Sequence, residues 1–202
     1  MLGDYEDMKR RVILANEAMK SIDKIWPSRK VHINRKLKAY KTIAKSVMCY
    51  NYQTWGLTKA QREELDRSHR KQLRRVWNDP NKRNQRLYEE SNENKLSDDM
   101  RNAKWRAMGH MLRLNRETPC QKAMDYYFEE NEKFKKFAGR MRTTLPVTIN
   151  EDIKIARSSD NTFPISKLEN SHDLMLIRDI ASDRKLWREL TEKICNPAQG
   201  ES

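Results

Sequence analysis

Apolar residues recur at spacings of three and four along most of the chain, which is the period of an amphipathic helix. In the first half, this pattern predicts one helix over residues 4–26, a second over residues 31–55 and a third ending at Trp77. No stretch shows sustained alternation of apolar and polar residues, and no hairpin signal is present. The sequence therefore predicts an all-α fold whose first domain, residues 1–79, is a basic three-helix unit.

Turn-forming and capping residues separate these three helices. Pro27 ends the first helix, because proline cannot continue a helix. Gly56 is the predicted C-cap of the second helix, and Thr58 is the predicted N-cap of the third. Asn78-Asp79-Pro80 then breaks the helical pattern and marks a linker.

Helical periodicity returns within residues 80–195, which form the second predicted domain. Ser97 is the predicted N-cap of a fourth helix, and Thr118-Pro119 opens a fifth. Further helices are predicted over residues 144–157 and over residues 171–194, with a break near Ala181 in the last.

Three stretches lack this periodicity. Residues 80–94 are polar and predict only one short turn, near residues 86–89. Residues 137–144 predict a basic loop that contains a glycine, and residues 196–202 predict a disordered tail.

The net charge of +13 lies entirely in the first half of the chain. Residues 1–113 contain 27 Lys or Arg and 14 Asp or Glu, whereas residues 114–202 contain 15 of each. No acidic residue lies between Asp23 and Glu63, where ten basic residues occur. This asymmetry indicates a nucleic-acid or acidic-membrane partner for the first half, and the alternative is a solvated surface that keeps the protein soluble.

Two sets of basic residues recur at helical spacing and form the main candidate nucleic-acid site. The set on the second helix is Arg35, Lys38, Lys41 and Lys45. The set on the third helix is Arg67, Arg70, Lys71, Arg74 and Arg75. Because the first set avoids the apolar stripe, replacing Lys38, Lys41 and Lys45 with Glu is predicted to weaken binding without unfolding the helix.

Two further candidates contain glycine. Gly109 lies inside a predicted helix, where glycine costs about 1 kcal/mol relative to alanine, so it indicates close helix packing or contact with a nucleic-acid backbone. The adjacent His110 is either a phosphate donor or a buried histidine. Arg140 and Arg142 follow Gly139 in a basic loop that binds phosphate or is simply exposed.

Signatures of catalysis are absent from the sequence. It contains no Gly-rich phosphate loop, no His-Glu-x-x-His motif and no nucleophile elbow. Asp98-Asp99 suits the first turn of a helix better than a metal site. The scattered Cys49, Cys120 and Cys195 argue against a disulfide framework and a zinc site. We therefore expect no cofactor and no metal.

Membrane association is not predicted either. The N-terminal residues are charged and lack the apolar segment of a secretory signal. No apolar run approaches the length of about 18 residues that a membrane helix needs.

Short motifs also follow one another in a distinctive order. They are Arg10-Arg11 with Ala15 and Ala18, Trp26, Lys36-Leu37 with Tyr40, Cys49–Trp55, Leu73-Arg74-Arg75-Val76, Trp105 with Gly109, His110 and Arg113, Gly139-Arg140, and Asp183-Arg184 with Trp187. In order and spacing, over about residues 4–190, they resemble the region after the palm in non-LTR (LINE-type) retrotransposon reverse transcriptases. Asn51, Gln53 and Met141 depart from the Gly, Glu and Pro that are usual there.

This resemblance implies a thumb-like helical domain and a linker domain that grip template RNA and the RNA–DNA duplex. It also adds His110 and Arg113 to the candidate nucleic-acid-binding residues, and implies an intracellular location in the nucleus or a cytoplasmic ribonucleoprotein. The parent family is an RNA-directed DNA polymerase, but the palm's Tyr-x-Asp-Asp motif does not occur. We therefore expect a non-catalytic, nucleic-acid-binding fragment.

Two alternatives belong to other functional classes. The chain could be part of an active polymerase whose palm is encoded upstream, and that palm would then be a partner. It could instead be a helical module that binds another protein, with incidental charge.

Overall fold

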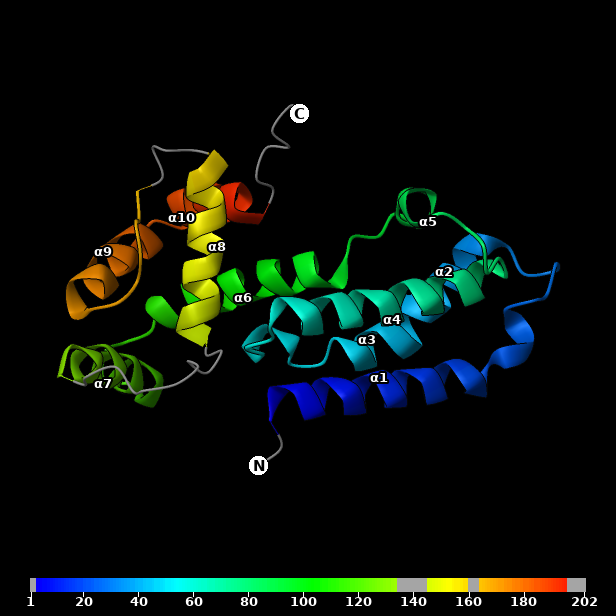
Figure 1. The fold of residues 1–202 in the computed structure, drawn as a ribbon, viewed down its shortest axis with the longest axis horizontal. Helices are drawn as coiled ribbons and strands as arrows, with labels where there is room; N and C mark the ends of the chain where they lie inside the picture. The colour runs from blue at the N-terminus through cyan, green and yellow to red at the C-terminus, as the bar shows by residue number, and fades with distance from the viewer. Residues whose placement is uncertain (1–2, 134–144, 160–163, 196–202) are drawn as a thin grey trace. The chain divides into compact units, whose positions relative to one another are not determined.

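The computed structural model describes residues 3–133, 145–159 and 164–195, and the fold is all-α. Figure 1 shows helices joined by turns, and no strand occurs in the described ranges. The chain divides into two compact units, Met1–Met100 and Arg101–Ser202. The division therefore comes after Met100, later than the boundary at residue 79 that the sequence predicts.

The first unit contains the three predicted helical regions and more. Its elements are α1 (Asp4–Ser21), η1 (Asp23–Ile25), α2 (Ile33–Tyr40), the π-helical η2 (Lys41–Lys45), α3 (Ser46–Met48), η3 (Tyr52–Thr54), α4 (Lys59–Trp77), α5 (Asn84–Ser91) and the start of α6 (Leu96–Leu112). Because α5 and the start of α6 belong to this unit, it is larger than a three-helix bundle.

The ends of the helices show where local signals succeed. The hydroxyl of Thr58 accepts a hydrogen bond from the backbone N–H of Gln61, and the Gln61 side chain accepts one from the N–H of Thr58. This capping box confirms Thr58 as the N-cap of α4. The second helix does not extend to residue 55, since α3 ends at Met48 and Asn51 adopts a left-handed conformation with φ of 57°.

The core of the first unit explains why residues 80–100 belong to it. Leu87 of α5 and Leu96 of α6 are completely buried in the same cluster as Leu73 of α4. The prediction of only a short turn in residues 80–94 is therefore wrong. Leu87 packs against apolar residues from other helices, and its polar neighbours in the sequence give no sign of this contact.

Two tryptophans of this unit, Trp26 and Trp55, are core residues. Trp26 is buried and its Nε1 donates to the carbonyl of Met19 at 2.9 Å. Trp55 is buried and its Nε1 donates to Asp7 at 3.1 Å. The Lys36 ammonium, also buried, donates to the carbonyl of Trp26 at 2.6 Å and so ties α2 to the preceding turn.

The second unit has its own hydrophobic core. It contains the rest of α6, α7 (Pro119–Lys133), α8 (Leu145–Ser159), α9 (Ser171–Ser182) and α10 (Arg184–Cys195). The break between α9 and α10 confirms the one predicted near Ala181. The predicted loop and tail, residues 137–144 and 196–202, lie outside the described residues.

Gly109 is explained by packing within this unit. A Cβ atom built at Gly109 would lie 2.1 Å from Nε1 of Trp187. Trp187 is buried and donates from that same nitrogen to the carbonyl of Trp105 at 3.2 Å. Close approach of α10 to α6 therefore requires glycine at this position.

Candidate nucleic-acid interface

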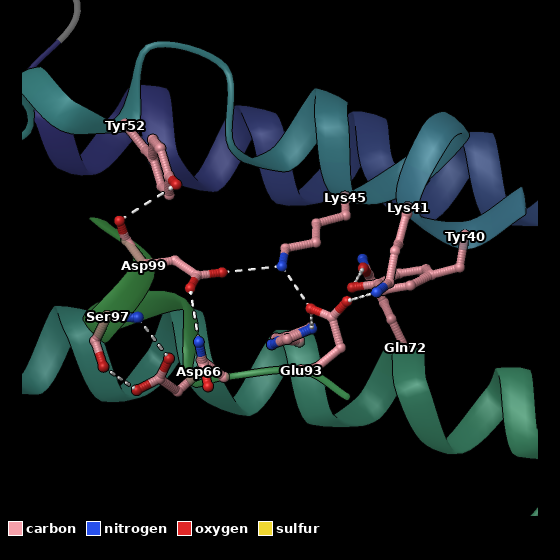
Figure 2. Close-up of polar contacts among 11 residues, drawn as sticks. Tyr40, Lys41, Lys45, Tyr52, Asp66, Gln72, Glu93, Ser97 and Asp99 are labelled. Carbon is pink, nitrogen blue, oxygen red and sulfur yellow. Dashed lines mark hydrogen bonds and ion pairs between the residues drawn. The ribbon is translucent and has the colours of Figure 1, made fainter. Parts of the chain in front are cut away.

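Two of the four residues on the predicted basic face of the second helix, Lys41 and Lys45, pair with one buried carboxylate. Glu93, whose side chain is 2% exposed, forms ion pairs with both Lys41 (2.8 Å) and Lys45, and Lys45 also donates a hydrogen bond to it. Lys45 also pairs with Asp99 at 2.9 Å, and Figure 2 shows its ammonium between the two carboxylates. Lys45, predicted as a nucleic-acid contact, therefore has its charge compensated inside the unit.

The electrostatics of Lys45 agree with this structural role. Burial by itself lowers the pKa of Lys45, but hydrogen bonds to Glu93 and Asp99 outweigh that effect and raise the pKa above its ordinary value. Lys41 is more accessible than Lys45 but shares the same carboxylate. Both lysines belong to the π-helical segment η2, a type of turn that often marks a specialised site in a helix.

Aromatic rings enclose the histidine beside this ion pair. His69 is completely buried, and its ring stacks on Tyr40 at a centroid distance of 5.9 Å. Its Nε2 lies 3.8 Å from Glu93, and neither ring nitrogen has a hydrogen-bond partner. Burial, with a further contribution from Lys45, lowers the pKa of His69 to about 3. His69 is therefore neutral near pH 7.

The start of α6 is held by a carboxylate from α4. Asp66 accepts hydrogen bonds from the backbone N–H of Ser97 at 2.9 Å and from its hydroxyl at 2.6 Å (Figure 2). Burial raises the pKa of Asp66, although the hydrogen bonds from Ser97 act in the opposite direction. Ser97 lies inside α6, which begins at Leu96, so it is not the N-cap that the sequence predicts.

The adjacent Asp98 and Asp99 lie in the first turn of α6, where the helix dipole favours acidic side chains. Asp99 is bound to Lys45, and its carbonyl accepts from the hydroxyl of Tyr52 at 3.4 Å. Within the described ranges, no group of three or more His, Cys, Asp or Glu side chains is arranged to hold a metal ion.

The predicted basic face of α4 contains both paired and unpaired residues. Arg70 pairs with Glu63 at 2.6 Å, and Arg75 pairs with Asp23 at 2.6 Å. Arg74 donates to the side chain of Asn84 at 2.6 Å and to the carbonyl of Lys82 at 3.1 Å, so it fixes the turn after α4.

Four predicted contact residues of the first unit remain both exposed and without an ion pair among the described residues. They are Arg35, Lys38, Arg67 and Lys71. The structure thus separates these cations, which are available to a ligand, from Lys45, Arg70, Arg74 and Arg75, which stabilise the unit.

The second-unit candidates also differ from one another. His110 is exposed on α6, whereas the guanidinium of Arg113 donates to the carbonyl of Ala181 at 3.1 Å and fixes the end of α9. Arg140 and Arg142 lie outside the described residues.

Sequence reasoning missed three buried carboxylates, which are Asp66, Glu93 and Asp152. Glu93 lies in a polar stretch, and its partner Lys45 is 48 residues away, so no local spacing reveals the pair. In the second unit, Asp152 of α8 is buried and accepts from Arg101, Lys104 and the indole of Trp105, each at 3.1 Å. In the sequence, Asp152 is marked only by being a carboxylate at a position on the apolar stripe of α8.

Two further findings concern membrane-spanning helices and similarity to known proteins. Within the part of the chain that the structure describes, no helix has both the length and the apolar character of a membrane span. No protein-family model, curated protein or solved structure matches this chain.

Proposed function

We propose that the chain is a non-catalytic nucleic-acid-binding protein whose first unit binds the phosphate backbone of RNA or of an RNA–DNA duplex. The resemblance to the thumb and linker of a retrotransposon reverse transcriptase supports this proposal. A reverse transcriptase palm is then a candidate protein partner.

The observation that carries the proposal is the uneven pairing of charge in the first unit. Residues 1–100 contain 23 Lys or Arg and 14 Asp or Glu. Among the described residues, the acids that form ion pairs inside the unit include Asp7, Asp23, Glu63, Glu90, Glu93 and Asp99. Other basic residues are exposed and have no ion pair with another described residue, among them Arg29, Lys30, Arg35 and Lys38. This positive surface suits a polyanion.

Binding of this kind depends on salt in a characteristic way. Each phosphate contact releases a counterion, so the logarithm of the affinity falls with the logarithm of salt by about 0.9 per contact on a duplex. Fluorescence anisotropy of labelled RNA–DNA hybrid and single-stranded RNA, titrated with the full chain at several salt concentrations, measures this slope. We expect a steep slope and little dependence on base sequence, and an absence of binding at low salt would refute the proposal.

The second unit favours a different candidate function, contact with another protein. Its exposed apolar side chains include Tyr126 (67% exposed), Met175 (53%) and Leu176 (46%). Binding driven by such side chains would persist at high salt, in contrast to binding to phosphates. A partner retained at high salt and released by Met175→Ser with Leu176→Ser would favour this alternative.

A further inference from the structure

Helices α1 and α4 of the first unit lie against each other and run in the same direction. Near their beginnings, the hydroxyl of Tyr5 donates to Glu64 at 2.9 Å. Near their ends, Arg75 of α4 pairs at 2.6 Å with Asp23, just after α1. These two contacts define the line along which the helices meet.

Basic residues of α4 lie along this line. Arg67 and Lys71 follow Glu64 by three and seven residues, and Lys71 precedes Arg75 by four. Residues at these spacings share one side of a helix. Since Glu64 and Arg75 both contact the α1 segment, Arg67 and Lys71 lie on the side of α4 that borders α1.

Basic residues of α1 border the same line from the other side. Lys9 follows Tyr5 by four residues, and Lys20 follows Asn16 by four. Asn16, like Tyr5, contacts α4, because its side chain accepts from Gln72 at 3.0 Å. Lys24 lies in the adjoining η1, directly after Asp23, whose carboxylate pairs with Arg75 of α4. We define the α1–α4 seam by these five cations: Lys9, Lys20, Lys24, Arg67 and Lys71.

The charges of the α1–α4 seam are available to a ligand. All five side chains are exposed. Lys9 lies over the ring of Tyr5 at 3.9 Å, and the other four have no ion pair among the described residues.

The acids near the seam do little to cancel this charge. Glu64 is hydrogen-bonded to Tyr5, and Asp23 is paired with Arg75. Glu63, four residues before Arg67, is paired with Arg70, which leaves Glu6 and Glu17 as exposed acids of α1 near the seam. Ile13, four residues after Lys9 on the same side of α1, is 58% exposed and places an apolar side chain beside the seam cations.

We infer that a nucleic acid lays one phosphate backbone along the α1–α4 seam. Lys9 and Lys20 are eleven residues apart on α1, which corresponds to about 16 Å at about 1.5 Å per residue. One strand of a duplex places about five phosphates over that length, at about 3.4 Å of axis each. This inference rests on the proposed function and assigns its contact surface to residues beyond the Arg35–Lys45 face.

Charge-neutralising pairs in the full chain test this assignment. Lys20→Gln with Lys71→Gln removes two seam cations, whereas Arg83→Gln with Arg86→Gln removes two exposed cations at α5 and serves as the matched control. With labelled RNA–DNA hybrid, we expect the seam pair to reduce the salt slope of the affinity by about 2 and the control pair to leave it unchanged. A third pair, Arg35→Gln with Lys38→Gln, measures the share of the face predicted from sequence.

The outcomes separate this inference from the proposed function. If the unmodified chain does not bind at low salt, the proposed function fails. If it binds but the seam and control pairs have equal slopes, only the seam assignment fails. Circular dichroism melting of each variant verifies the fold, and Lys20→Gln with Arg67→Gln replaces the first pair if that pair unfolds.

Discussion

At the scale of single residues, Lys38 and Lys45 show how two similar side chains differ in role. They lie seven residues apart on one continuous helical region. Lys38 is exposed without an ion pair among the described residues, whereas Lys45 is bound to Glu93 and Asp99. The sequence alone treats the two lysines as equivalent, but replacing each one separately with glutamate should have unequal effects on stability.

We predict that Lys45→Glu destabilises the protein by about 3 kcal/mol, because it places a third carboxylate beside Asp99, which loses its counterion, and Glu93, which keeps only Lys41. Lys38→Glu should change the free energy of unfolding by less than about 0.5 kcal/mol, as is usual for a surface position. Urea unfolding followed by circular dichroism compares the two variants. Equal stability of both would show that the ion pair with Glu93 contributes nothing.

His69 predicts a distinct dependence of stability on pH. Its pKa is about 3 in the folded protein and about 6.5 in a free chain, so between these values only the unfolded chain takes up the proton. Stability should therefore fall as the pH falls through this interval, by up to about 1.4 kcal/mol per pH unit from this side chain.

The variant His69→Gln isolates this contribution. Asp66, whose pKa is raised, acts in the opposite direction at low pH but is present in both proteins. Urea unfolding of each protein at pH values between about 4 and about 7 should give a shallower acid dependence for His69→Gln. Parallel curves for the two proteins would contradict a neutral His69 in the folded state.

At the scale of helices, the packing of α6 against α10 depends on the absence of one side chain. Gly109→Ala would place a Cβ 2.1 Å from the rigid, buried ring of Trp187. Alanine favours a helix by about 1 kcal/mol over glycine, but overpacking of a core costs about 1–3 kcal/mol. We expect a net loss of stability, seen as a lower melting temperature.

The matched control for this substitution is Arg106→Ala, at an exposed position of the same helix. Because arginine and alanine have similar helix propensities, Arg106→Ala should leave the melting temperature almost unchanged and so shows the effect of a substitution on α6 away from Trp187. A melting temperature of Gly109→Ala at or above that of the unmodified protein would mean that Trp187 can move aside without cost.

The helices also show what the sequence can and cannot predict. Local signals locate α4 through the Thr58 capping box and separate α9 from α10 near Ala181. They fail at Asn51, whose left-handed backbone ends the second helical region early, and at Leu87, whose partners come from distant helices. Burial depends on packing across the chain, and the local hydrophobic period does not contain that information.

The same limit applies to the candidate interface. Sequence spacing predicts the exposed pair Arg35 and Lys38, because a shared helix face is a local property. The same spacing includes Lys45, although its charge is paired with the distant Glu93 in the folded protein. It omits Lys20, because only the tertiary structure shows that this side of α1 borders α4. Charge composition indicates a polyanion ligand, but the surface that meets it requires the fold.

At the scale of the whole molecule, the two units have separate hydrophobic cores. Leu73 is completely buried in the core of the first unit, and Ile177 is completely buried in the core of the second. Such cores allow each unit to open by itself, as contiguous groups of helices do in many proteins. Helix α6 contributes residues to both units, because the division falls after Met100.

We predict that core truncations act mainly within their own unit. Leu73→Ala should lower the opening free energy of first-unit amides by about 2–5 kcal/mol, because it removes buried methyl groups and leaves a cavity. Amides of α9 and α10 should keep most of their protection, and Ile177→Ala should show the reverse pattern. Native-state hydrogen exchange measures both; an equal loss throughout the chain after either substitution would mean that α6 couples the two cores into one cooperative structure.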